Sequence, residues 1–148
     1  GEGCACMIGG ISKAVLSRLK EKKDEIVLID AEAGLEHFGR RVDSTCDLIL
    51  FIVDPSYESI HMAERTLQLA AEAGVQAYFI LNKVEKELNE TVTAEFDPGK
   101  IVASLPTSRD LFLQSLKGEP LDPTLPELEK VFSFIENFKK PLTLNVRM

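Results

Sequence analysis

The sequence of 148 residues lacks an apolar run long enough to cross a membrane, which takes about 18 or more consecutive apolar residues. Its first residues also lack the basic segment, apolar run and cleavage site that together make a secretion signal. We therefore expect a cytoplasmic protein without a membrane span.

An excess of positive charge is absent as well. The chain holds 17 Lys and Arg residues against 24 Asp and Glu residues, and its formal net charge is −7. Proteins that bind nucleic acid normally rely on basic residues, which release counterions from the phosphate backbone. We therefore predict that nucleic acid is not a partner.

Cysteine is scarce and odd in number, with three residues in the chain. The spacing is not that of a small secreted protein held by disulfides, so reduced thiols or metal thiolates are expected instead. Cys46 stands just before an apolar run, and we expect it to be a buried thiol of the core.

Apolar material is plentiful, with 45% hydrophobic residues against 28% charged residues. This composition suits one globular domain with a sizeable core. We expect a single domain over 1–148, with an α/β core at 1–118 and a linker, helix and tail at 119–148.

Short apolar runs alternate with helical patterns along the chain. Continuous runs typical of strands covered on both faces occur at 25–30, 47–54, 77–84 and 100–106. Helical patterns occur at 12–24, 59–74, 108–118 and 127–138. This alternation predicts an α/β fold of three layers, a mostly parallel sheet with flanking helices.

Two of the helical patterns carry a clear apolar stripe. The pattern at 59–74 places Ile60, Ala63 and Leu67 on one stripe and ends at Gly74, which suits a helix C-cap. The pattern at 127–138 predicts a packing face made of Leu128, Val131, Phe132, Ile135 and Phe138.

The expected strands end in polar or turn-forming residues. These ends read "IDAEAG", "IVDPS", "LNKV" and "SLPTS". Ligands of parallel α/β sheets bind at the carboxyl ends of the strands, so we expect the chemistry to gather there.

Two of these strand ends have a specific use in nucleotide binding. Asp30 can orient magnesium or its water, and Gly34 lets a backbone N–H approach a γ-phosphate; Asp30 also fits a simple turn. Asn82 can hydrogen-bond the edge of an adenine or cap the following helix.

Together these segments carry a family resemblance. "GEGCAC", "IVLIDAEAGLEHFGR", "IVDPSYESIHMAERTLQLA", "ILNKV" and a last strand ending in Pro106 resemble the nickel-insertion ATPases of carbon monoxide dehydrogenase maturation. That is the CooC type, within the MinD-like deviant P-loop ATPases. "DAEAGLEHFGR" is the most specific part, and the resemblance runs from residue 1 to about residue 120.

The resemblance implies an ATP-dependent homodimer that serves carbon monoxide dehydrogenase. Asp30 would end the strand of the magnesium site and Gly34 would belong to the phosphate-sensing switch. Asn82 would contact the adenine of ATP or ADP, and the loop after Pro106 would close over the base. Cys4 and Cys6 match the family's Cys-x-Cys motif, which binds nickel or zinc at the dimer interface.

A phosphate loop of the "GKGGVGKT" kind is missing from the sequence. The chain resembles the C-terminal portion of such an ATPase, as an artificial, proteolytic or natural truncation. Because no loop amides and no lysine hold the β- and γ-phosphates, we expect little or no ATP hydrolysis by this chain alone.

The missing strand of that loop would stand between the strands ending at Asp30 and Asp54 in the family. An open sheet edge has to be covered. We expect that the two flanking strands close up, or that another chain or the tail at 142–146 fills the gap.

The Cys4 and Cys6 pair has two readings. Zinc and nickel thiolate sites take about four ligands, which two copies of Cys-x-Cys across a twofold axis would supply. The alternative is a pair of reduced cysteines in a loop near the chain end.

Other candidates near the switch stay open. Glu36 and His37 suit a metal or switch contact, or equally a solvent-facing or capping role. Arg40 and Arg41 would pair with a phosphate or with acidic neighbours, while His61, inside a helical pattern, is expected to be structural.

The leading hypothesis is therefore part of a nickel-insertion accessory ATPase. The alternative is a non-enzymatic metal-binding and dimerisation module on an α/β scaffold. A flavodoxin-like or receiver domain is disfavoured, because the chain shows neither the phosphate loop of the first nor the clustered early acids of the second.

Overall fold

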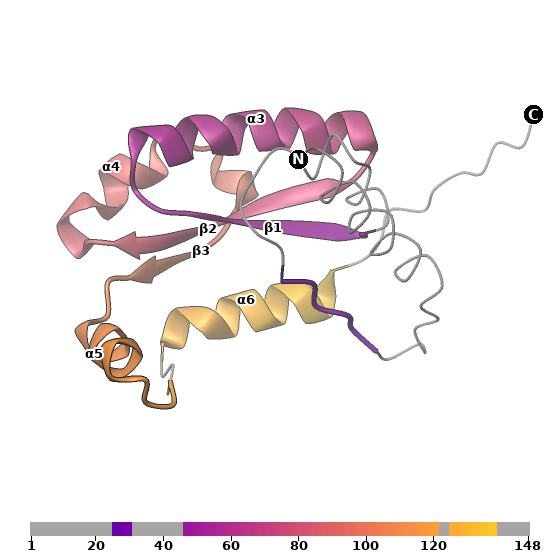
Figure 1. Cartoon of the computed structure of the whole chain (residues 1–148). Helices are drawn as coiled ribbons and strands as arrows, with labels where there is room; N and C mark the ends of the chain where they lie inside the picture. Colours follow the sequence, from indigo (N-terminus) through magenta and orange to yellow (C-terminus); the bar gives the residue numbers. More distant parts are fainter. Residues whose placement is uncertain (1–24, 31–45, 122–124, 139–148) are drawn as a thin grey trace, which may run out of the picture.

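The computed structural model describes residues 25–30, 46–121 and 125–138 (Figure 1). In chain order the helices and strands are β1 (Leu48–Val53), α3 (Tyr57–Ala73), β2 (Gln76–Val84), η2 (Lys86–Leu88), α4 (Asn89–Thr93), η3 (Pro98–Lys100), β3 (Ile101–Pro106), α5 (Arg109–Lys117) and α6 (Pro126–Asn137).

The three strands form one parallel sheet in the order β1-β2-β3. Leu48 pairs with Gln76 and Val53 with Leu81, so β1 and β2 run in step over the whole of β1. The strands predicted at 47–54, 77–84 and 100–106 are confirmed, as is the α/β class with a parallel sheet and flanking helices.

Helices cover both faces of this sheet (Figure 1). On one face Phe79 and Leu81 of β2 pack with Val53 and with Ala63 of α3. On the other face Ile80 of β2 packs with Ala103 and Val131. Neighbouring residues of β2 thus point into different layers, which explains why its sequence is apolar without alternation.

The ends of α3 follow from local chemistry. The Ser56 side chain accepts a hydrogen bond from the Ser59 N–H at 3.2 Å and caps the N-terminus. At the other end Gly74 has a φ of 72°, a left-handed conformation that glycine adopts without a steric penalty. The prediction that this helix ends at Gly74 is confirmed.

The packing face predicted for α6 is correct in part. Val131 is buried and Ile135 packs against its cluster. Phe132, however, is 55% exposed, and Phe134 meets the ring of Tyr78 instead, with 4.7 Å between ring centroids. Phe132 lies one residue from Val131, about 100° away around the helix, so it points off the stripe.

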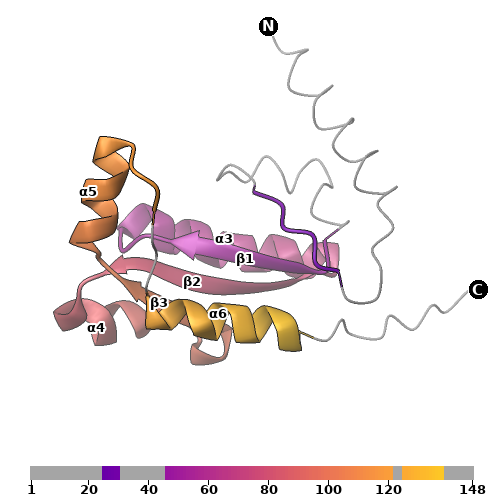
Figure 2. The same ribbon diagram turned by 90° about the horizontal axis from the view of Figure 1, so that it is seen from below.

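The strand predicted at 25–30 is wrong, because this described segment adopts no regular structure and joins no sheet (Figure 2). Its apolar side chains are exposed, with Leu28 at 79%. A strand is defined by ladder hydrogen bonds to a neighbour, which an apolar run does not supply by itself.

The structure also tests how the β1 edge is covered. In the described part of the chain β1 pairs with β2 alone, so the expected closing up of the strands ending at Asp30 and Asp54 is wrong. The tail at 142–146, the other candidate within this chain, lies outside the described residues.

Two phenylalanines that differ in burial allow a matched test of the core. Phe79 is 1% exposed and Phe112 is 64% exposed. We expect Phe79→Ala to lower the free energy of unfolding by about 3–5 kcal/mol, because it removes a buried ring and leaves a cavity. Phe112→Ala should change it by less than about 0.5 kcal/mol. Urea denaturation followed by circular dichroism measures both, and equal effects would contradict the described core.

Candidate functional site

Polar side chains from three strands meet at the carboxyl edge of the sheet. Asp54 directly follows β1, Asn82 and Lys83 lie near the end of β2, and Thr107 follows β3. The strand arrows of Figures 1 and 2 point toward this edge, from which α3 and α5 start. The predicted convergence of the strand ends is thus observed for three of the four.

Asp54 is the centre of this group. Nδ2 of Asn82 donates a hydrogen bond to Oδ1 of Asp54 at 3.0 Å. Nζ of Lys83 donates to Oδ2 of the same carboxylate, also at 3.0 Å. The side chains of Asp54 and Lys83 are 44% and 65% exposed, so this ion pair contributes at most about 1 kcal/mol to stability.

The backbone at Lys83 is unusual. Its φ is 54°, and among the described residues it is the only residue other than glycine with a positive φ. A left-handed conformation costs an L-residue about 1–2 kcal/mol. Oγ1 of Thr107 donates to the Lys83 carbonyl at 3.0 Å, so the loop after β3 helps to hold this conformation.

The unusual backbone serves the packing of β2. Leu81 and Val84 both belong to the core cluster beneath α3, although a regular strand would turn residues three apart to different faces. The pairing register between β2 and β3 shifts between these two residues. The resulting bulge carries Asn82 and Lys83 out of the core and toward Asp54.

The role of Asn82 as a helix cap, left open by the sequence, is wrong. The next helices, η2 and α4, have Glu85 and Leu88 at their N-caps, and neither cap uses a side-chain hydrogen bond. The amide of Asn82 is directed instead to Asp54, across to the end of the neighbouring strand.

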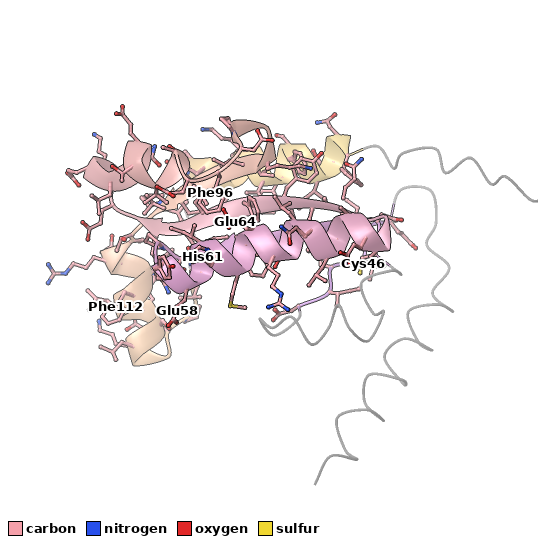
Figure 3. The ribbon with its side chains drawn as sticks, turned by 90° about the horizontal axis from the view of Figure 1, so that it is seen from above. Cys46, Glu58, His61, Glu64, Phe96 and Phe112 are labelled. Atoms are coloured by element: carbon pink, nitrogen blue, oxygen red, sulfur yellow. The ribbon has the colours of Figure 1, made fainter. Side chains whose placement is uncertain are left out.

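Two further sequence candidates lie elsewhere. Cys46 is half-buried, so the prediction of a buried core thiol is wrong; it precedes β1 and lies far from Glu58 and Phe112 at the other end of the sheet (Figure 3). His61 is an exposed residue of α3, with its Nδ1 3.5 Å from Oε2 of Glu64 and its ring edge-on to Tyr57 (Figure 3).

Most candidates for the phosphate and metal sites lie outside the described residues. These are Cys4, Cys6, Gly34, Glu36, His37, Arg40 and Arg41. Asp30 is described and exposed, as the last residue of the segment 25–30. Within the described ranges no group of three or more His, Cys, Asp or Glu side chains could hold a metal ion.

Sequence reasoning placed Asn82, Pro106 and the strand end at Asp54 at this edge but missed the contacts that Asp54, Lys83 and Thr107 make there. Asp54 had a visible signal, since it ends an apolar run. The signal for Lys83 was weaker: Asn82 and Lys83 are two polar residues between apolar positions of a strand, a pattern that indicates a bulge. Nothing in the sequence indicated the hydrogen bond from Thr107.

The fold and this edge define a class: a parallel α/β domain whose polar residues gather where such sheets bind ligands. No protein-family model matches the chain. Among the described residues no helix is both long and apolar enough to cross a membrane.

Comparison with known proteins finds relatives that are named as ATP-binding proteins. The chain is 38% identical over 135 residues to the uncharacterised ATP-binding protein MJ0084 of Methanocaldococcus jannaschii, covering 91% of this chain and 54% of that protein. It is 33% identical over 146 residues to MJ0823, another uncharacterised ATP-binding protein of that organism, covering 94% and 57%.

A third relative has a named role. The carbon monoxide dehydrogenase accessory protein CooC of Rhodospirillum rubrum is 35% identical over 85 residues, covering 57% of this chain and 32% of that protein. The resemblance to CooC and to ATP-binding proteins is thus supported. The chain spans about half the length of the first two relatives.

The strained backbone at Lys83 can be tested with two replacements at one position. We expect Lys83→Gly to be more stable than Lys83→Ala by about 1 kcal/mol, because glycine adopts a positive φ without strain. Lys86, in the 3-10 helix η2, is the control, where the alanine variant should be the more stable one. Urea denaturation measures all four variants. A Lys83→Gly variant less stable than Lys83→Ala would contradict the bulge.

Proposed function

We propose that the chain binds an adenine nucleotide at the carboxyl edge of its sheet, with Asn82 facing the base and the loop after Pro106 closing over it. The observation that carries this proposal is the convergence of Asp54, Asn82 and Lys83 at the ends of β1 and β2. The ATP-binding relatives support the choice of nucleotide.

The position of Asn82 suits contact with a base. Its side chain is half-buried and tied on one side to Asp54, which limits the entropy lost when a ligand binds. Thr107, the first residue of the loop after β3, donates a hydrogen bond to the carbonyl of Lys83, the residue next to Asn82. A base that contacts Asn82 would therefore lie beside this loop.

The phosphates and magnesium belong to other residues in this proposal. Asp30 would orient magnesium and Gly34 would sense the γ-phosphate. Magnesium sites use one or two carboxylates and complete the coordination with waters and substrate phosphates, so a single exposed carboxylate such as Asp30 is chemically suited to it.

The base contact can be tested by nuclear magnetic resonance on the 148-residue chain. We expect ADP to shift signals at the ends of β1 and β2, with a dissociation constant in about the millimolar range if the base supplies most of the contacts. Asn82→Ala should weaken binding about tenfold or more, because it removes the polar contact with adenine.

The matched control is Asn137→Ala, at the C-terminal end of α6, where the Asn137 side chain donates to the Ser133 carbonyl of its own helix. This variant should bind ADP as the unaltered chain does. Equal affinities of the Asn82→Ala variant and the unaltered chain would overturn the base site.

We further propose that the protein is an accessory factor that delivers nickel to carbon monoxide dehydrogenase. Cys4 and Cys6 from two copies would form one four-thiolate site for nickel or zinc at a homodimer interface. The similarity to CooC supports the dehydrogenase as partner. The chemistry of the donor set supports the metal, since thiolates bind these borderline ions well.

Metal binding has a direct test in calorimetry with zinc or nickel. We expect one ion per two chains, dimerisation seen by sedimentation when metal is added, and loss of both in Cys4→Ser. Cys46→Ser is the control and should keep the stoichiometry. Unchanged binding in Cys4→Ser would exclude the site, and metal binding without any nucleotide binding would favour the non-enzymatic module.

A further inference from the structure

We infer that Asp54 is a positioning residue that fixes the amide of Asn82 and so makes the base site select adenine over guanine. This inference rests on the proposed contact between Asn82 and the base. The sequence marks Asp54 only as the end of a strand. The inference gives Asp54 a further role, because it would determine which purine the base site accepts.

The orientation of the Asn82 amide follows from the chemistry of its neighbour. An ionised carboxylate has no hydrogen to donate, so the group of Asn82 that faces Oδ1 of Asp54 has to be the NH₂ group. Turning the amide over would replace this hydrogen bond with two oxygens facing each other. Oδ2 of Asp54 is occupied by Lys83, so the carboxylate is held on both sides.

The backbone around this pair is also fixed. The Ser56 N–H donates to the Asp54 carbonyl at 2.8 Å, in the turn that leads into α3. On the other strand the Thr107 hydroxyl holds the Lys83 carbonyl. Both partners of the hydrogen bond are therefore anchored before any ligand arrives.

What remains of Asn82 is a defined pair of groups. In the described part of the chain its Oδ1 accepts no hydrogen bond, and one N–H of its Nδ2 remains after the bond to Asp54. On its Watson–Crick edge adenine presents an amino donor at N6 beside an acceptor at N1, which matches this pair. Guanine presents an acceptor at O6 beside an N1–H donor, the reverse of adenine, so its O6 would face Oδ1 of Asn82 and its N1–H would face the NH₂ group.

Rejection of guanine therefore depends on Asp54. Guanine would be accepted if Asn82 could turn its NH₂ group toward O6 and its Oδ1 toward N1–H, and the Asp54 carboxylate opposes that turn. The Asp54 side chain is 44% exposed and its ion pair with Lys83 contributes little to stability, so removing the carboxylate should change selectivity more than folding.

The test is the ratio of the dissociation constants for GDP and ADP, measured on the 148-residue chain from nuclear magnetic resonance shifts. The unaltered chain should prefer ADP by about tenfold or more. In Asp54→Asn the preference should fall to within about threefold, because an amide at position 54 both donates and accepts and so permits either orientation of Asn82.

The control is Glu72→Gln, which makes the same change of charge on an exposed residue near the far end of α3. It should keep the preference of the unaltered chain. Asp54→Ala is the second variant if Asp54→Asn does not fold, and it should show the same loss of selectivity.

The outcomes separate this inference from the proposed function. If Asn82→Ala leaves ADP affinity unchanged, the base site itself is wrong. If Asn82→Ala weakens ADP binding but Asp54→Asn keeps the selectivity, the positioning role alone is overturned. Equal affinity of the unaltered chain for ADP and GDP also overturns it, without any variant.

Discussion

The burial of β2 on both faces is the constraint on which the rest of the structure depends. Phe79 and Leu81 pack under α3, while Ile80 faces α6, so the middle of the strand has no side left for polar residues before the bulge. Val84 then returns to the first cluster, and the residues between are displaced to the sheet edge. The strained φ of Lys83 is the local cost of keeping Leu81 and Val84 in one core while Asn82 reaches Asp54.

Where the sequence predicted the fold well, local pattern and tertiary packing agreed. The strand at 77–84 was visible because both of its faces are buried, and the end of α3 because Gly74 supplies the left-handed residue that a helix end requires. Residues 25–30 carry the same kind of apolar run yet form no strand, because hydrogen bonding to a neighbouring strand is not encoded in the run itself. Phe132 and Phe134 show the same limit on a helix: Phe132 is 55% exposed, whereas Phe134, about 200° away around the helix, meets the ring of Tyr78.

The sequence predicted where the candidate site lies, at the carboxyl ends of the strands, but not which side chains contact one another there. Parallel strands bring their carboxyl ends to one edge, so Asp54, Asn82 and Pro106 were expected near each other. The pairing of Asp54 with Asn82 arises from the bulge, which depends on how Leu81 and Val84 pack together. For Gly34, Cys4 and Cys6, the sequence and its resemblance remain the basis of the expectation.

The hydrogen bonds that join the three strand ends also couple formation of the site to folding of the sheet. Asp54 and Asn82 are 28 residues apart in the chain, and Thr107 and Lys83 are 24 apart. Each bond spans a crossover, so the entropy lost in closing the loop between its partners is offset only when the strands are paired. A nucleotide bound at this edge would therefore favour the complete fold over partly folded chains. Occupancy and folding are in this way thermodynamically linked.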